Sequence, residues 1–150
     1  MENKLIWIAD DHVKTRENLE SALRGRGFTQ IESFTDGYYI LERLEKANPN
    51  NANTLPIPKI IVMDTEMESS YNGITTLNYI RNDEKYFHAK KVYVIGISSD
   101  DTYKKEWLYY GAQDFFNKAK LFGENRDYDF RIDMKCFEGL FEKIVNGLLS

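Results

Sequence analysis

A short apolar run that ends on a carboxylate constrains the fold of this chain more than any other stretch. Residues Ile60 to Met63 are all apolar, Pro58 lies just upstream, and Asp64 follows directly. A run of this length without alternation predicts a strand buried on both faces, as in the centre of a parallel sheet. Asp64 would then lie at the carboxyl end of that strand, where open α/β sheets bind ligands. The alternative is that Asp64 only caps the following segment.

The remaining sequence alternates between strand and helix signals. Apolar runs predict further strands at residues 4–9, 30–34, 91–97 and 114–117. Helical periodicity is found at residues 13–23, 38–44, 74–81, 100–110 and 137–148. Strands that alternate with helices in this way predict right-handed crossovers and one parallel sheet covered by helices on both faces. The fold class is therefore α/β, a doubly wound five-stranded sheet.

Composition excludes several classes of protein. The chain has 150 residues and a net charge of -4, so it fits one domain and lacks the basic footprint of a nucleic-acid-binding domain. No stretch approaches the roughly 20 apolar residues that span a bilayer, and the start does not resemble a signal peptide. The single cysteine, Cys136, fits a reducing compartment. We expect a cytoplasmic protein that binds neither nucleic acid nor membrane.

Polar residues of different chemical kinds follow four of the predicted strands. They are Asp10 and Asp11 after the first, Asp64 after the third, Ser98 at the end of the fourth and Lys118 after the fifth. The carboxyl ends of parallel strands share one edge, so these side chains should converge. Crowded carboxylates oppose one another's ionisation, and a divalent cation resolves that conflict. Oxygen ligands of this kind suit Mg²⁺.

An aspartate in such a site can accept a phosphoryl group when a metal and a cation neutralise the transferred charge. Lys118 would pair with a phosphoryl oxygen, and the Ser98 hydroxyl would donate to another. Two plainer interpretations stay open: Asp10 and Asp11 could cap the first helix, and Lys118 could be a solvated lysine. His12 is expected on the helix surface rather than at a metal, because Mg²⁺ prefers oxygen.

The ordered set of strand-end residues resembles the receiver domain of two-component response regulators. The resemblance covers nearly the whole chain. It is carried by Asp10-Asp11, by Asp64 in Ile-Val-Met-Asp-Thr-Glu-Met, by Gly73, by Ser98-Ser99 and by the run Gly111 to Lys118. The family is flavodoxin-like, so the resemblance implies the strand order 2-1-3-4-5.

The resemblance also implies a role for each matching residue. The catalytic residues would be Asp64 as phosphoacceptor, Ser98 and Lys118. The Mg²⁺ site would comprise Asp10, Asp11, Asp64 and Glu66, the last through its backbone carbonyl. The switch residues would be Ser98 and Phe115, an aromatic that in the family turns inward on activation. The sequence departs from the family where Glu68 follows Met67 and where Ala119 follows Lys118, since proline is usual at both places.

The function implied is that of a stand-alone receiver, phosphorylated on Asp64 by a histidine kinase or phosphotransfer protein, which then switches a surface for an unknown downstream protein. Such a chain catalyses its own phosphoryl transfer and autodephosphorylation without being a metabolic enzyme. The first alternative is a receiver-fold interaction module that signals without phosphate. An aspartate-nucleophile phosphatase is a weaker alternative, because Glu66 only partly matches the second Asp of a DxD pattern.

We expect a single receiver domain over residues 1–150, with insertions near 48–58 and 120–135, no output domain, and a monomer or weak homodimer. Tyr103, Trp107 and Tyr110 recur at helical spacing on the fourth helix. At least one of them should pack on the sheet. If Trp107 or Tyr110 were exposed instead, they would mark a partner surface.

Overall fold

Five parallel strands form one sheet in the order β2-β1-β3-β4-β5. The computed structural model describes residues 3–52, 54–67, 69–125 and 131–150, without the side chains of 123–125. The strands are β1 (Ile6–Ala9), β2 (Ile31–Phe34), β3 (Ile60–Asp64), β4 (Tyr93–Ser98) and β5 (Asp114–Asn117). The predicted fold class and strand order are confirmed. None of the helices in these residues is long and apolar enough to cross a membrane.

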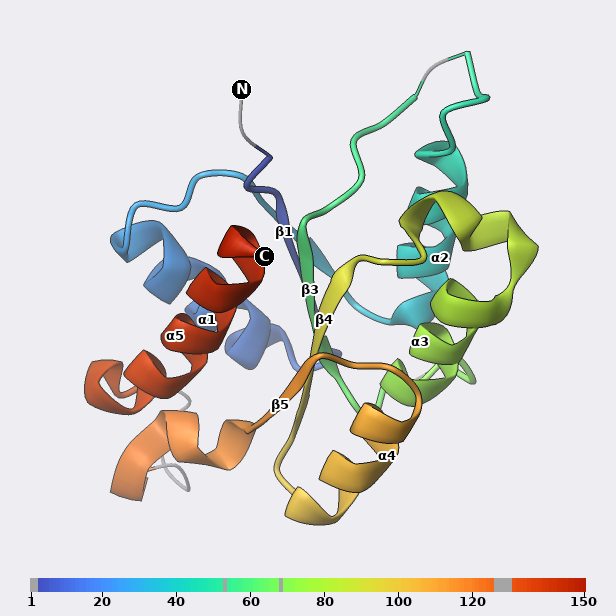
Figure 1. Ribbon diagram of the computed structural model, residues 1–150. Helices are drawn as coiled ribbons and strands as arrows, with labels where there is room; N and C mark the ends of the chain where they lie inside the picture. Colours follow the sequence, from blue (N-terminus) through green and yellow to red (C-terminus); the bar gives the residue numbers. More distant parts are fainter. Residues whose placement is uncertain (1–2, 53, 68, 126–130) are drawn as a thin grey trace.

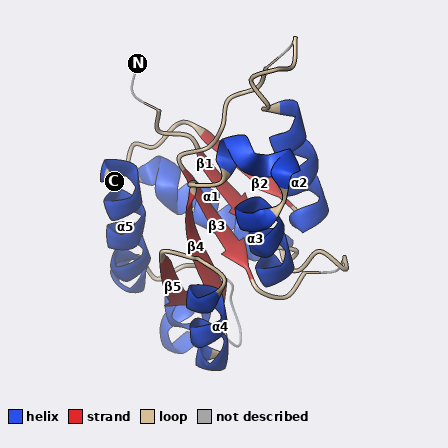
Figure 2. Ribbon diagram, turned by 45° about the vertical axis from the view of Figure 1, so that its right-hand side comes forward, coloured by secondary structure: helices blue, strands red, loops and turns tan. Residues whose placement is uncertain are grey.

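Helices cover both faces of the sheet. The helices are α1 (Val13–Gly25), α2 (Gly37–Lys46), α3 (Gly73–Asn82), α4 (Lys104–Tyr109) and α5 (Met134–Leu149). α1 and α5 lie on one face, and α2, α3 and α4 lie on the other (Figure 1). Coloured by element, the strands form a central layer between the helices (Figure 2). This three-layer arrangement leaves the carboxyl ends of the strands along one open edge.

The apolar runs are explained by burial on both sides of the central strands. In β1, Ile8 faces the α1 and α5 layer, whereas Trp7 faces the opposite layer and packs on Phe34 at 4.8 Å between ring centroids. In β3, Val62 likewise faces the α1 and α5 layer, and Met63 faces the opposite layer. A strand that is apolar on both faces can be stable only in the interior of the sheet, and β1 and β3 take those positions.

Three short 3-10 helices supplement the five helices in the described residues: η1 (Glu84–Ala89), η2 (Asp101–Tyr103) and η3 (Lys118–Asn125). η3 falls where the sequence suggested the start of an insertion. Its Leu121 is fully buried in the core beneath α1 and α5, and the Leu121 carbonyl accepts a 2.7 Å bond from the Asp133 amide. The first part of the 120–135 segment is therefore part of the core, and residues 126–130 lie outside the described chain.

Candidate functional site

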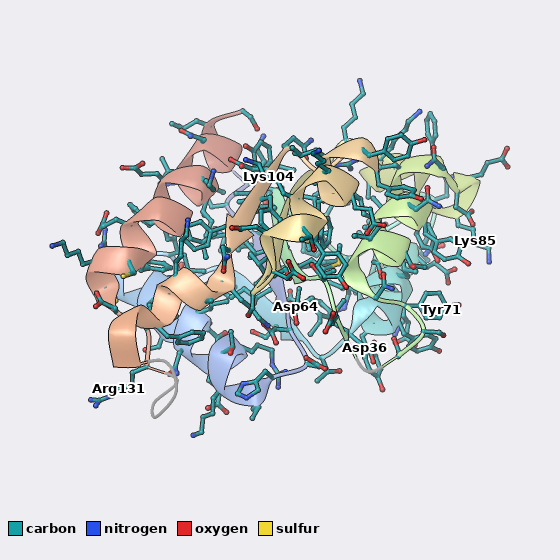
Figure 3. All side chains as sticks on the ribbon, turned by 90° about the horizontal axis from the view of Figure 1, so that it is seen from below. Asp36, Asp64, Tyr71, Lys85, Lys104 and Arg131 are labelled. Carbon is teal, nitrogen blue, oxygen red and sulfur yellow. The ribbon has the colours of Figure 1, made fainter. Side chains whose placement is uncertain are left out.

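The residues expected at the strand ends surround one open pocket of about 410 Å³. Viewed toward this edge of the sheet, Asp64 lies near the middle of the molecule, between the two helical layers (Figure 3). The pocket is lined by Asp11, His12, Thr15, Asp64, Glu66, Ser98, Ser99, Asp100, Lys118 and Phe122. Phe122 comes from η3 and was not expected from the sequence, because the charged surroundings of that segment concealed its helical turn.

Three carboxylates cluster at this edge of the sheet. One oxygen each of Asp10, Asp11 and Asp64 lies within 4.8 Å of the others. Asp10 and Asp64 are buried, and Asp11 is more open to solvent. A ligand set made only of carboxylate oxygens, with one side open for water, fits a Mg²⁺ ion. The parallel sheet produces this cluster directly, because β1 and β3 are neighbours and both end there.

Lys118 lies between two of these carboxylates. Its Nζ atom is 3.1 Å from an oxygen of Asp10 and 3.0 Å from an oxygen of Asp64, and its side chain is only 16% exposed. The interpretation of Lys118 as an ordinary solvated lysine is therefore wrong. The ammonium group neutralises part of the negative charge that the sheet topology brings together.

The charges in the pocket shift two pKa values. Burial, together with the neighbouring Asp10, raises the pKa of Asp64 to about 7, although Lys118 and the Thr65 amide oppose the shift. The pKa of Lys118 is also raised: burial acts against its charged form, but the attraction of Asp10 and Asp64 outweighs it. Lys118 therefore carries its charge at neutral pH, while Asp64 is poised between its two protonation states.

Asp10 does not cap the first helix. The N-cap of α1 is His12, whose Nδ1 atom accepts from the Thr15 amide at 3.4 Å. Asp10 instead stabilises the turn that precedes α1. Its carboxylate accepts a hydrogen bond from the His12 amide at 2.8 Å, and its backbone carbonyl accepts one from the Arg16 side chain at 2.7 Å. The capping alternative for Asp10 and Asp11 is thus wrong, and His12 is the N-cap of α1.

Ser98 and the turn after β4 form the opposite wall. The buried Ser98 hydroxyl oxygen accepts from the Asp100 amide at 3.0 Å. Asp100 in turn caps η2 by accepting from the Thr102 amide at 2.9 Å, and this bond lowers the pKa of Asp100. The turn therefore holds the Ser98 hydroxyl oxygen at the pocket.

Glu66 lies at the rim and not at the floor. Its exposed carboxylate accepts a 3.0 Å bond from the Tyr103 hydroxyl, which belongs to η2. That hydrogen bond raises the pKa of Tyr103. The bond joins the loop after β3 to the segment that leads into α4.

A second bond joins the same two segments beneath the surface, and the sequence did not suggest it. The indole N–H of Trp107 in α4 donates to the hydroxyl of Thr65 at 2.7 Å, and that hydroxyl donates to the Ile97 carbonyl at 2.8 Å. Trp107 is fully buried and is the one buried residue of α4. The alternative of an exposed Trp107 is therefore wrong.

Two glycines make room for the Trp107 ring. A Cβ atom on Gly96 would lie 2.2 Å from the indole, and one on Gly73 would lie 2.6 Å from it. Both distances are far below van der Waals contact, so any side chain at either position would displace the ring. Thr65, Gly73 and Gly96 together define the place of α4 on the sheet.

Phe115 does not line the pocket. Its side chain is buried in the core beneath α2, α3 and α4, on the face of the sheet that also holds Trp107. Phe115 belongs to β5 and is paired in register with Gly96 of β4. The structure therefore brings together Asp10, Asp11, Asp64, Ser98 and Lys118, and leaves Glu66 at the rim and Phe115 below.

Comparison with known proteins agrees with this geometry. The family model of the response regulator receiver domain matches residues 6–124. The chain belongs to this family. It is thus a receiver domain of two-component signalling, a class whose members bind Mg²⁺ at an acidic pocket and interact with histidine kinases or phosphotransfer proteins. No curated protein matches the sequence.

Solved structures of receivers share the fold at low sequence identity. The response regulator domain of CheB from Thermotoga maritima has a TM-score of 0.69 at 22% identity, with 99% of this chain and 98% of that chain covered. The receiver domain of the sensor histidine kinase PA1611 from Pseudomonas aeruginosa, solved with a magnesium ion coordinated in its active site cleft, has a TM-score of 0.69 at 16% identity, with 99% of each chain covered. The receiver fold thus tolerates extensive sequence change.

Proposed function

We propose that this receiver is a phosphorylation-dependent switch in which Asp64 accepts a phosphoryl group. The observation that carries the proposal is the position of Lys118, which contacts both Asp64 and Asp10 within the acidic pocket. A lysine so placed can pair with a phosphoryl oxygen as soon as the group reaches Asp64. The donor would be a histidine kinase or a phosphotransfer protein.

In the transfer, a carboxylate oxygen of Asp64 attacks phosphorus, and the bond from phosphorus to the donor nitrogen breaks. Lys118 and the Ser98 hydroxyl would bind oxygens of the transferred group. The carboxylates of Asp10, Asp11 and Asp64, with the backbone carbonyl of Glu66, would hold Mg²⁺. When bound, the ion neutralises charge that develops on the phosphoryl oxygens. Hydrolysis of the resulting acyl phosphate by water would return the switch to its resting state.

The output would pass through α4. Thr65, which follows Asp64 directly, accepts a hydrogen bond from Trp107, and Glu66 accepts one from Tyr103. Both residues after the proposed phosphoacceptor are therefore hydrogen-bonded to the α4 segment. A shift of this loop on phosphorylation would move the segment. The coupling through Ser98 and Phe115, expected from the family, stays a prediction. So do the single-domain organisation, the weak or absent self-association and the cytoplasmic location.

Incubation with Mg²⁺ and acetyl phosphate, followed by intact mass measurement, tests the proposal. Wild type should gain about 80 Da, the mass of one phosphoryl group, and Asp64→Asn should gain nothing. Asp114→Asn is a matched control, because it makes the same substitution at a carboxylate that pairs with Lys143 outside the pocket, and it should be phosphorylated as wild type is. An unmodified wild type would instead favour the phosphorylation-independent interaction module.

A further inference from the structure

A second hollow lies at the opposite edge of the sheet from Asp64. It is a groove of about 640 Å³ between the end of α3 and the end of α4, next to the segments that lead into β4 and β5. We call it the α3–α4 groove. It is lined by Asn78, Arg81, Asn82, Lys90, Lys91, Tyr109, Tyr110 and Gly111. None of these residues takes part in the phosphoryl site.

The groove is positive on a chain that is negative overall. Arg81, Lys90 and Lys91 line it, no lining residue is acidic, and the chain carries a net charge of -4. Two lining asparagines bond to each other, Asn82 to Asn78 at 2.7 Å. A charge of this sign, set against the sign of the whole chain, favours an acidic ligand over a basic one.

Arg81 lacks a carboxylate partner within the described residues. Its guanidinium donates to the carbonyls of Lys90 at 2.7 Å, Val92 at 2.8 Å and Gly111 at 2.9 Å, and to the side-chain oxygen of Gln113 at 3.0 Å. All four acceptors are neutral, and burial lowers the pKa of the Arg81 group. One of the two N–H bonds on Nη1 has no acceptor in this part of the chain. An incoming carboxylate would supply the missing countercharge.

Aromatic rings border the cations. Tyr109 is 82% exposed and lies edge-to-face on Tyr110, with 5.1 Å between ring centroids. Phe87 is 69% exposed, and the ammonium group of Lys90 lies 5.4 Å from its ring centroid. Exposed rings beside cations that have no acidic partner among the described residues are typical of surfaces that bury apolar and acidic side chains of a partner together. A small inorganic anion would contact only the cations and leave the aromatic rings exposed to water, so the groove better fits a ligand with both acidic and apolar groups.

We propose that the α3–α4 groove binds an acidic segment of a partner protein, one in which Glu or Asp alternates with Leu or Phe. The carboxylates would lie against Arg81, Lys90 and Lys91, and the apolar side chains would lie on Tyr109 and Phe87. The wall of the groove that α4 supplies is anchored to Thr65 by Trp107. If Asp64 is phosphorylated as proposed above, the affinity of the groove would change with it, but binding itself does not depend on that step.

The test uses fluorescence anisotropy with a short fluorescein-labelled peptide of alternating Glu and Leu or Phe. The double variant Lys90→Glu/Lys91→Glu should weaken binding at least about tenfold, which corresponds to about 1.4 kcal/mol. The matched control, Lys46→Glu/Lys135→Glu, makes the same change in net charge on exposed lysines outside the groove and should change affinity less than about twofold. Tyr109→Ser should weaken binding without any change of charge.

Equal losses in the two double variants, no binding by wild type, or equal binding of a peptide with Gln in place of Glu would each overturn the proposal. Amide chemical shifts supply the location: changes should centre on Lys90, Lys91 and Tyr109, and changes centred on α1 and α5 would refute the groove. Asp64→Asn should bind the peptide as wild type does. A wild type that binds the peptide and resists phosphorylation would therefore refute the switch and leave the groove standing.

Discussion

Trp107 and Thr65 share one buried hydrogen bond, 2.7 Å long, between the indole N–H and the hydroxyl of the residue that follows Asp64. The Thr65 hydroxyl has a single hydrogen, which it donates to the Ile97 carbonyl, so its lone pair is directed at the indole. The bond joins the pocket to the helix that borders the α3–α4 groove. Together with the bond between Glu66 and Tyr103, it connects the strand that ends at Asp64 to the α4 segment.

Removal of either partner of this bond should lower the stability of the fold, and the two losses should not be additive. Trp107→Phe removes the N–H and replaces the indole by a smaller phenyl ring, and Thr65→Val removes the hydroxyl; each should lower the free energy of unfolding by about 1–3 kcal/mol. The double variant should lose less than the sum of the single variants, because the second change removes a partner that is already missing. Urea unfolding of the four proteins measures this coupling. Strictly additive losses would mean that the contact contributes no pairwise energy.

The space around the Trp107 ring predicts a second effect. Gly96→Ala should lower the free energy of unfolding by about 1–3 kcal/mol, because the new methyl group collides with the indole. Gly25→Ala is the matched control, since a Cβ atom there meets nothing within 4 Å. Thermal unfolding should separate the two variants by several degrees. An undisturbed Gly96→Ala protein would show that α4 can move aside freely.

The raised pKa of Asp64 predicts a pH dependence of stability. Its ordinary pKa is 3.8 and its pKa in the folded chain is about 7, so between these values the folded state holds a proton that the unfolded state has released. The free energy of unfolding contributed by this group must then fall as pH rises from about 4 to 7. Asp64→Asn removes the cost and should be more stable than wild type by about 1–3 kcal/mol at pH 8, with no such gain at pH 4.

Denaturant titrations at several pH values measure this difference. A difference between Asp64→Asn and wild type that stays constant from pH 4 to 8 would contradict a shifted Asp64. Mg²⁺ supplies an independent readout: at ten times its dissociation constant it should stabilise wild type by about 1.4 kcal/mol and Asp64→Asn by much less. Na⁺ at equal ionic strength controls for general screening.

The ion pairs of Lys118 and Lys143 should contribute different amounts to the free energy of unfolding. Lys118→Met leaves the buried carboxylates of Asp10 and Asp64 without their cation and should lower the free energy of unfolding by about 3 kcal/mol or more. Lys143→Met breaks a half-exposed pair with Asp114 and should cost less than about 1 kcal/mol. Added Mg²⁺ should stabilise Lys118→Met more than it stabilises Lys143→Met, because only the Lys118 variant has lost the cation that neutralises the pocket carboxylates. Similar losses in both, unaffected by Mg²⁺, would show that the pocket charges are already well solvated.

The acidic cluster was accessible from the sequence because topology alone produces it. Once Asp10, Asp64 and Lys118 are placed after strands of one parallel sheet, they must share an edge, whatever the details of packing. The contact of Trp107 with Thr65 is of another kind. It depends on the angle at which α4 crosses the sheet and on the absence of side chains at Gly73 and Gly96, and no periodic pattern carries that information.

The position of Phe122 was missed for a related reason. η3 lies in a charged stretch with no helical periodicity, and its fold is fixed by Leu121 in the core rather than by local preference. The α3–α4 groove is equally invisible in the sequence, since Arg81, Lys90 and Tyr109 belong to three separate segments. These features arise from tertiary packing, whereas the strands and the pocket carboxylates follow from pattern and connectivity.

α4 is six residues long and holds to the sheet through one buried side chain. Helices so short are marginal on their own, so the detachment of α4 requires neither the loss of the sheet nor the loss of the other helices. Its amide protons can therefore exchange with solvent through a local opening. The free energy of that opening depends on the bond to Thr65, which follows Asp64 in the sequence. A change at Asp64 would therefore alter how often this segment is formed as well as where it lies.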